Sequence, residues 1–196
     1  KINELKIKNV DLFQLDILEV NLLEKKFDII ECSGVLHHMK IPSKGLEVLL
    51  NVLNEDGFIK LGLYSQLARK DIQEARSYIA EHHLKANSKD IKSFRKSVLS
   101  GNIKRIKNLQ NWANFYTTSE CRDLCFHSQE HRFNIKQIEE ILTSNKLQFL
   151  GFILPKQVRT MYNNYFPADK KQINLKNWEK FECKYPNTFR GMYQFW

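Results

Sequence analysis

The sequence is poor in the residues that mark several common classes of protein. It has only seven glycines, the first at position 34, and no Gly-x-Gly pair, so the glycine loop with which many nucleotide-binding domains open does not occur in it. Its four cysteines are sparse and irregularly spaced, which excludes a disulfide framework and suits reduced thiols in a cytoplasmic location. No apolar run approaches the roughly 18 residues that span a bilayer, so we expect no membrane association.

What is present predicts a folded α/β core. Apolar residues make up 42% of the 196 residues and aromatic residues 12%, which favours a globular protein over a disordered chain. Residues 27–32 and 58–63 are short apolar runs bounded by turn signals, as buried parallel strands are. Ser33 and Gly34 form a turn after the first run, and a helix is predicted over residues 46–53, with Gly57 as a left-handed residue at its end. This β-α-β unit places a ligand crevice at the carboxyl ends of its strands.

The amino-acid sequence of this unit resembles that of a known enzyme family. The segment Phe27-Asp-Ile-Ile-Glu-Cys-Ser-Gly-Val-Leu-His-His-Met39, followed by Pro42 and a Leu-rich helix that ends in glycine, is similar to the middle of class I S-adenosylmethionine-dependent methyltransferases. The strings Gly-Leu-Tyr-Ser-x-Leu-Ala-Arg, Phe-His-Ser-Gln-Glu-His-Arg-Phe and Phe-Arg-Gly-Met-Tyr-Gln-Phe-Trp resemble bacterial members of types 11 and 12, which sometimes carry tetratricopeptide repeats.

The resemblance implies a partial Rossmann-like sheet that lacks the first strands of the family. Residues 1–5 would be the end of a helix and residues 10–15 the third strand, so we interpret the chain as N-terminally truncated. A helical lid insertion and an aromatic C-terminal extension complete the predicted fold. The expected parts are residues 1–65 for the cofactor-binding core, 66–125 for the lid, and 126–196 for the last helix and strands with the extension.

The resemblance also assigns a cofactor, S-adenosylmethionine, and residues to bind it. Asp16 and Ile17 would bind the adenine, although an Asp at this place is also a common helix cap. Cys32, Ser33 and Gly34 would line the methionine part, unless they form only a connecting turn. His37 would face the transferred methyl group or a substrate, or else pack structurally.

A polar cluster between residues 121 and 132 has four interpretations. His127-Ser-Gln-Glu-His131 fits the H-x-x-E-H signature of a zinc hydrolase, with Glu130 as base and Glu179 or Glu182 as third ligand. Cys121, Cys125, His127 and His131 could bind a structural metal only if their helix breaks. The remaining interpretations are a structural polar network and, the one on which we settle, a substrate pocket without metal. Its candidates, with Tyr64 from the end of the preceding strand, are Tyr64, Arg122, His127, Glu130 and His131.

The sequence of the C-terminal third predicts one helix and two strands. Asn134 with Gln137 forms a capping box that opens a helix over residues 135–143. Residues 147–154 are predicted to be a strand, and residues 192–196 an edge strand beside it. The closing aromatic residues are expected to pack in the core.

The net charge of +9 and pI near 9.3 permit an acidic partner. Between Lys85 and Lys107 eight basic residues stand against Asp90 alone, a pattern that fits either a nucleic-acid-binding face or a solvated helix. The predicted function is methyl transfer to an unidentified small molecule or protein. The alternative is a non-catalytic interaction module derived from the same fold.

Overall fold

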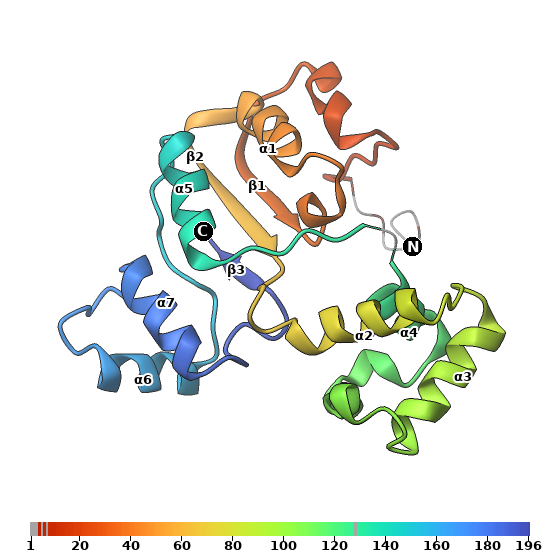
Figure 1. The fold of residues 1–196 in the computed structure, drawn as a ribbon. Coiled ribbons are helices and arrows are strands. Elements are labelled where there is room, and N and C mark those ends of the chain that lie inside the picture. Colours follow the sequence, from red (N-terminus) through yellow and green to blue (C-terminus); the bar gives the residue numbers. More distant parts are fainter. Residues whose placement is uncertain (1–3, 5, 7, 128) are drawn as a thin grey trace.

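The sheet confirms the predicted β-α-β unit, but its strands are not buried throughout as predicted, since Ile29 is 63% and Phe58 51% exposed. The structure, a computed structural model, describes residues 4, 6, 8–127 and 129–196. Strand β1 (Phe27–Ser33) pairs in parallel with β2 (Leu53–Leu63), helix α1 (Pro42–Asn51) connects them, and β3 (Tyr193–Phe195) adds to β2 in the antiparallel direction (Figure 1). Parallel β1 and β2 end at the same edge of the sheet, which fixes the place of the candidate site.

The predicted helix end between α1 and β2 is wrong. Strand β2 begins at Leu53 rather than at Phe58, and its register against β1 slips between Phe27 and Ile29. Gly57 lies inside this strand and does not adopt a left-handed backbone. A Cβ there would lie 2.8 Å from Leu53 Cδ1 and 2.9 Å from the Asn54 carbonyl oxygen. Because it has no side chain, Gly57 allows two chain segments to approach closely where the sheet is irregular.

The predicted strand over residues 10–15 is also wrong. These residues form an exposed irregular segment, in which Leu12 is 78% and Phe13 58% exposed. A strand requires a hydrogen-bonded neighbour, and within the described residues β1 pairs only with β2. The chain then enters a 3₁₀ helix, η1 (Ile17–Leu23). The helix end predicted for residues 1–5 lies mostly outside the described residues.

The segment after β2 is helical, as predicted. It comprises α2 (Lys70–Glu81), α3 (Ser88–Leu99), η3 (Lys104–Asn111), η4 (Ala113–Phe115) and α4 (Thr118–Phe126). Asn87 and Thr117 cap α3 and α4 by accepting backbone N–H bonds with their side chains. The apolar faces of these helices enclose a buried cluster of their own, with Phe94 and Phe115 at 2% and 0% exposure. The domain limits at residues 65 and 125 stay predictions.

The C-terminal third packs a second buried cluster against the sheet. Helix α5 (Ile135–Ser144) begins with the predicted capping box of Asn134 and Gln137. Residues 147–154 do not form the predicted strand, although they lie beside the predicted partner: a bridge joins Phe152 to Phe195, and the N–H groups of Leu150 and Ile153 donate to the carbonyls of Trp196 and Gln194. The sequence did not predict helices α6 (Lys156–Tyr165) and α7 (Leu175–Lys184).

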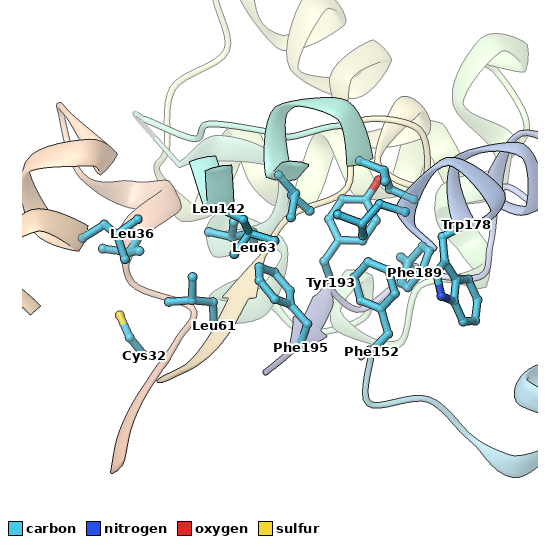
Figure 2. Close-up of a cluster of buried hydrophobic side chains, with 14 of the residues drawn as sticks. Cys32, Leu36, Leu61, Leu63, Leu142, Phe152, Trp178, Phe189, Tyr193 and Phe195 are labelled. Atoms are coloured by element: carbon cyan, nitrogen blue, oxygen red, sulfur yellow. The ribbon is translucent and has the colours of Figure 1, made fainter. Parts of the chain in front are cut away.

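The aromatic residues of this third do pack in the core, as expected. Figure 2 shows Phe152, Trp178, Phe189 and Tyr193 gathered beside β3. Trp178 is 1% exposed and its indole N–H donates to the carbonyl of Gln172 at 2.8 Å. Among the described residues, no helix combines the length and the apolar character that crossing a membrane requires.

Candidate functional site at the carboxyl ends of β1 and β2

The turn after β1 leaves open space at the edge of the sheet. Gly34 has a left-handed backbone, with φ of +80°, and a Cβ placed on it would have no atom within 4 Å. The hydroxyl of Ser33 is buried and has no hydrogen-bond partner among the residues that the structure describes. Buried polar groups are normally paired, so this hydroxyl points to a partner that comes from outside the chain. Cys32, just before it, is buried, and burial raises the pKa of its thiol.

Three side chains stack where the two strands end. The ring of His37 lies 3.7 Å from that of Tyr64, and the Arg69 guanidinium lies 3.6 Å from the Tyr64 ring centre. His37 is fully buried, and neither of its ring nitrogens makes a hydrogen bond within the described part of the chain. Burial, aided by the charges of His38 and Arg69, lowers the pKa of His37 to about 3. His37 is therefore neutral at pH 7 and has hydrogen-bonding capacity that the protein does not use.

Residues from the predicted polar cluster lie beside this stack. The His131 N–H donates to the His37 carbonyl at 2.7 Å, and the His127 ring lies 4.2 Å from that of His38. Further along, the Phe133 N–H donates to the Tyr64 carbonyl at 2.8 Å. The segment after α4 thus runs along the carboxyl ends of both strands. The structure brings Tyr64, His37, His127 and His131 together from three separate parts of the sequence.

Glu130 lies at the centre of an arginine cluster. Arg69 binds it with two hydrogen bonds, Nε to Oε1 at 3.1 Å and Nη2 to Oε2 at 2.7 Å. Arg76 and Arg132 add ion pairs at 3.5 and 3.6 Å, and the Glu130 side chain is only 1% exposed. Both carboxylate oxygens of Glu130 are thus engaged by guanidinium groups inside the protein. The geometry gives Glu130 a structural role and does not favour it as a general base.

The other predicted residues lie apart from this cluster. Arg122 is exposed on α4. Asp16 caps η1, where its carboxylate accepts the N–H of Leu18 at 2.9 Å, and Ile17 packs against the sheet core. Adenine binding by Asp16 and Ile17 stays a prediction, and so do the pocket roles of Arg122 and the histidines.

A metal site is not formed by the described part of the chain. No group of three or more His, Cys, Asp or Glu side chains there is placed to hold a metal ion. Glu130 is engaged by arginines, and Glu182 accepts hydrogen bonds from the hydroxyls of Ser65 and Tyr193 at 2.6 and 2.5 Å. The chemistry of the H-x-x-E-H signature, which needs a free glutamate base beside a metal, therefore has no support in this geometry.

Sequence reasoning missed two parts of this region. The buried Ser65–Glu182–Tyr193 bridge joins residues that are 117 and 11 positions apart in the chain, so no local pattern could predict it. Arg76 could have been predicted as a neighbour of Arg69, because it lies seven positions further on and residues at this spacing share one helix face.

The basic segment has both paired and solvated cations. On α3, Lys92 and Lys96 are exposed, whereas the Arg95 guanidinium donates to the Tyr116 carbonyl. Arg105, further along, pairs with Glu81. Nucleic-acid binding by this segment stays a prediction.

The comparisons with known proteins agree with this fold. The chain aligns with PKMT2 of Rickettsia typhi at a TM-score of 0.66 and 21% identity, over 93% of this chain and 38% of that one. With the structure of PKMT2 in complex with AdoHcy, the TM-score is 0.67 and the identity 19%, over 99% of this chain and 39% of that one. These likenesses establish a Rossmann-like α/β fold.

The sequence comparison then identifies the family. Residues 1–145 match the family model described as a methyltransferase domain, and the chain belongs to that family. An uncharacterized protein of Synechococcus sp. is 29% identical over 146 residues, which are 71% of this chain and 35% of that protein. The chain spans about a third of the length of that curated relative.

Proposed function

We propose that the protein containing this chain is an S-adenosylmethionine-dependent methyltransferase. The observation that carries the proposal is the turn after β1 in a chain of the methyltransferase-domain family. There the open space over Gly34 and the unpaired Ser33 hydroxyl lie at the edge where open α/β sheets bind ligands.

The residues present fit this cofactor. Gly34 permits close approach of a ligand to the backbone, and the Ser33 hydroxyl can bond a polar group of its amino-acid part. Asp16 is the proposed partner of the adenine, although its carboxylate now caps η1. When bound, S-adenosylmethionine supplies an electrophilic methyl group.

The chain's own residues would act mainly by positioning the acceptor. The His37–Tyr64–Arg69 stack forms a rigid wall beside the turn. His37, with a pKa of about 3, is a weak base at neutral pH and serves as a hydrogen-bonding group. We also propose a cytoplasmic location, which the four unpaired cysteines support.

Calorimetric titration of S-adenosylhomocysteine into the intact protein tests the proposal. Gly34→Ala should weaken binding at least about tenfold, or about 1.4 kcal/mol, because the added methyl group enters the ligand space. Gly101→Ala is a matched control, since Gly101 also has a left-handed backbone (φ of +74°) with open space around it and lies in the loop after α3. It should leave binding unchanged.

Two outcomes would count against the enzyme. If the intact protein binds neither S-adenosylhomocysteine nor S-adenosylmethionine, the non-catalytic interaction module becomes the better account. If both glycine variants weaken binding equally, backbone strain rather than ligand contact explains the loss, and the site lies elsewhere.

A further inference from the structure

A charged hollow lies next to the stacked residues, between helix α2 and the segment that follows α4. Its volume is about 530 Å³. Figure 1 shows α2 and α4 side by side, with the following segment crossing toward α5. The residues that line the hollow are Gln73, Arg76, Ser77, Gln129, Glu130, His131 and Arg132, together with Ala80.

The charges around this hollow do not balance. Arg76 and Arg132 line it, and Glu130 is the only acid among its lining residues. The charge of Glu130 is already matched by Arg69, which is 3% exposed and binds it with two hydrogen bonds. Two further guanidinium groups, 21% and 28% exposed, therefore face the hollow and share this one carboxylate with Arg69 through longer ion pairs of 3.5 and 3.6 Å.

Arg76 also has an unused donor. Its Nη2 donates to the His127 carbonyl at 2.6 Å, but its buried Nη1 makes no hydrogen bond and lies 3.5 Å from Glu130 Oε2. Burial lowers the pKa of Arg76, the nearby carboxylate of Glu130 opposes this shift, and the charges of Arg132 and Arg69 add to it. An anion in the hollow would reduce the repulsion between the guanidinium groups of Arg76 and Arg132.

We propose that Arg76 and Arg132 bind an oxyanion in this hollow, and that the anion is a carboxylate or phosphate group of the methyl acceptor. Guanidinium groups match both kinds of oxyanion in a forked geometry. His131 lines the hollow and bonds the His37 carbonyl at 2.7 Å, which connects the anion site to the proposed reaction site. The acceptor part of the proposal rests on the proposed function, whereas the anion site does not.

The test measures anion binding to the intact protein by calorimetry, with inorganic phosphate in one arm and succinate in the other. Arg132→Gln is the main variant, because among the described residues this side chain pairs only with Glu130, at the long distance of 3.6 Å. It should weaken the preferred anion at least about tenfold. Arg76→Lys keeps the charge but removes the fork, so it should weaken the anion by a smaller factor. Arg159→Gln, on the exposed face of α6, removes the same charge elsewhere and should have no effect.

The outcomes separate the two proposals. A preference for phosphate or for succinate, lost in Arg132→Gln and kept in Arg159→Gln, supports the anion site and identifies the acceptor as a phosphate ester or a carboxylate. Equal weakening by both variants, or no binding of either anion, overturns it. S-adenosylhomocysteine titrated into the same samples reports on the proposed function alone. Binding of an anion without that ligand would leave the site standing and remove the methyltransferase.

Discussion

At the scale of single residues, this region is defined by buried charges and by donors that lack partners. Glu130 is surrounded by Arg69, Arg76 and Arg132, while His37 and Ser33 have no partner for their buried polar atoms. The first arrangement satisfies the carboxylate of Glu130 and stabilises the crossing of α2 by the later segment, but among the described residues it leaves Arg76 Nη1 without a hydrogen bond. The second is incomplete, and incomplete buried polar groups mark places where a ligand or water completes the bonding.

Removing the charge of Glu130 should destabilise the fold. Glu130→Gln leaves the 3% exposed Arg69 without a counterion, and breaking one half of a buried pair typically costs about 3–5 kcal/mol. Urea unfolding would show this as a lower midpoint with an unchanged slope. Glu140→Gln, on the exposed side of α5, should change the free energy of unfolding by less than about 0.5 kcal/mol. A loss of that small size at Glu130 would mean that the arginines find other partners.

His37 should make the fold sensitive to acid. Its pKa of about 3 in the folded protein lies below the unfolded value of about 6.5. The contribution of neutral His37 to the free energy of unfolding is therefore complete above pH 6.5, and it is lost progressively as the pH falls toward 3. His37→Phe keeps a ring against Tyr64 but cannot titrate, and His37→Gln serves if the larger ring does not fit.

The measurement is the free energy of unfolding at pH 7.5 and at pH 5.5. Wild type should lose about 1 kcal/mol more than either His37 variant over this interval. His83→Asn is the control, since His83 is exposed and Asn tolerates its positive φ of 52°. It should keep the acid sensitivity of wild type.

At the scale of elements, local chemistry sets the helix starts more firmly than the strands. The capping box before α5 has both of its bonds, Gln137 N–H to Asn134 Oδ1 at 2.8 Å and Asn134 N–H to Gln137 Oε1 at 2.9 Å. Asn134→Ala removes one of them and should lower the free energy of unfolding by about 1 kcal/mol. Lys136→Ala in the first turn, where the side chain is exposed, should be close to neutral. A neutral Asn134→Ala would mean that tertiary packing alone holds the helix start.

The same contrast explains which elements the sequence could predict. The capping box and the apolar run of β1 are local signals, and both predictions were confirmed. Residues 10–15 have a strand-like pattern, yet a strand needs a neighbour that no local signal specifies. Helices α6 and α7 were missed because aromatic residues hold half of their apolar positions, and aromatic side chains are as typical of strands. Tyr162 and Trp178 in fact stack across the two helices at 3.8 Å.

At the strand ends, too, only the local features could be predicted from the sequence. The position of Ser33 and Gly34 at the end of β1 follows from the β-α-β pattern. The stack of His37, Tyr64 and Arg69 does not, since it depends on the packing of a loop against a distant helix start. The sequence pattern grouped His127, Glu130 and His131 as pocket candidates, which stays a prediction, and it could not distinguish a structural carboxylate from a catalytic one.

At the scale of the whole molecule, the buried apolar residues form two separate clusters. One lies on the sheet with α5 and α7, and the other is enclosed by α2, α3, η3 and α4. The Arg69–Glu130 pair and the backbone bonds of Phe133 connect the two parts. Because few apolar contacts cross this junction, we expect the clusters to open as separate cooperative units.

Hydrogen exchange in two reciprocal variants tests this separation. Phe94→Ala removes a 2% exposed ring from the helical cluster, and Phe181→Ala removes a 1% exposed ring from the sheet cluster. Each should lower the free energy of unfolding of its own cluster by about 3–5 kcal/mol. Amide protection in α2–α4 should fall in the first variant while β1 and β2 keep theirs, and the second should show the reverse. Equal loss of protection in both parts would establish one cooperative unit. The proposed anion site at the junction would then be as rigid as the core, whereas separate units allow the hollow to open and close around its ligand without unfolding the sheet.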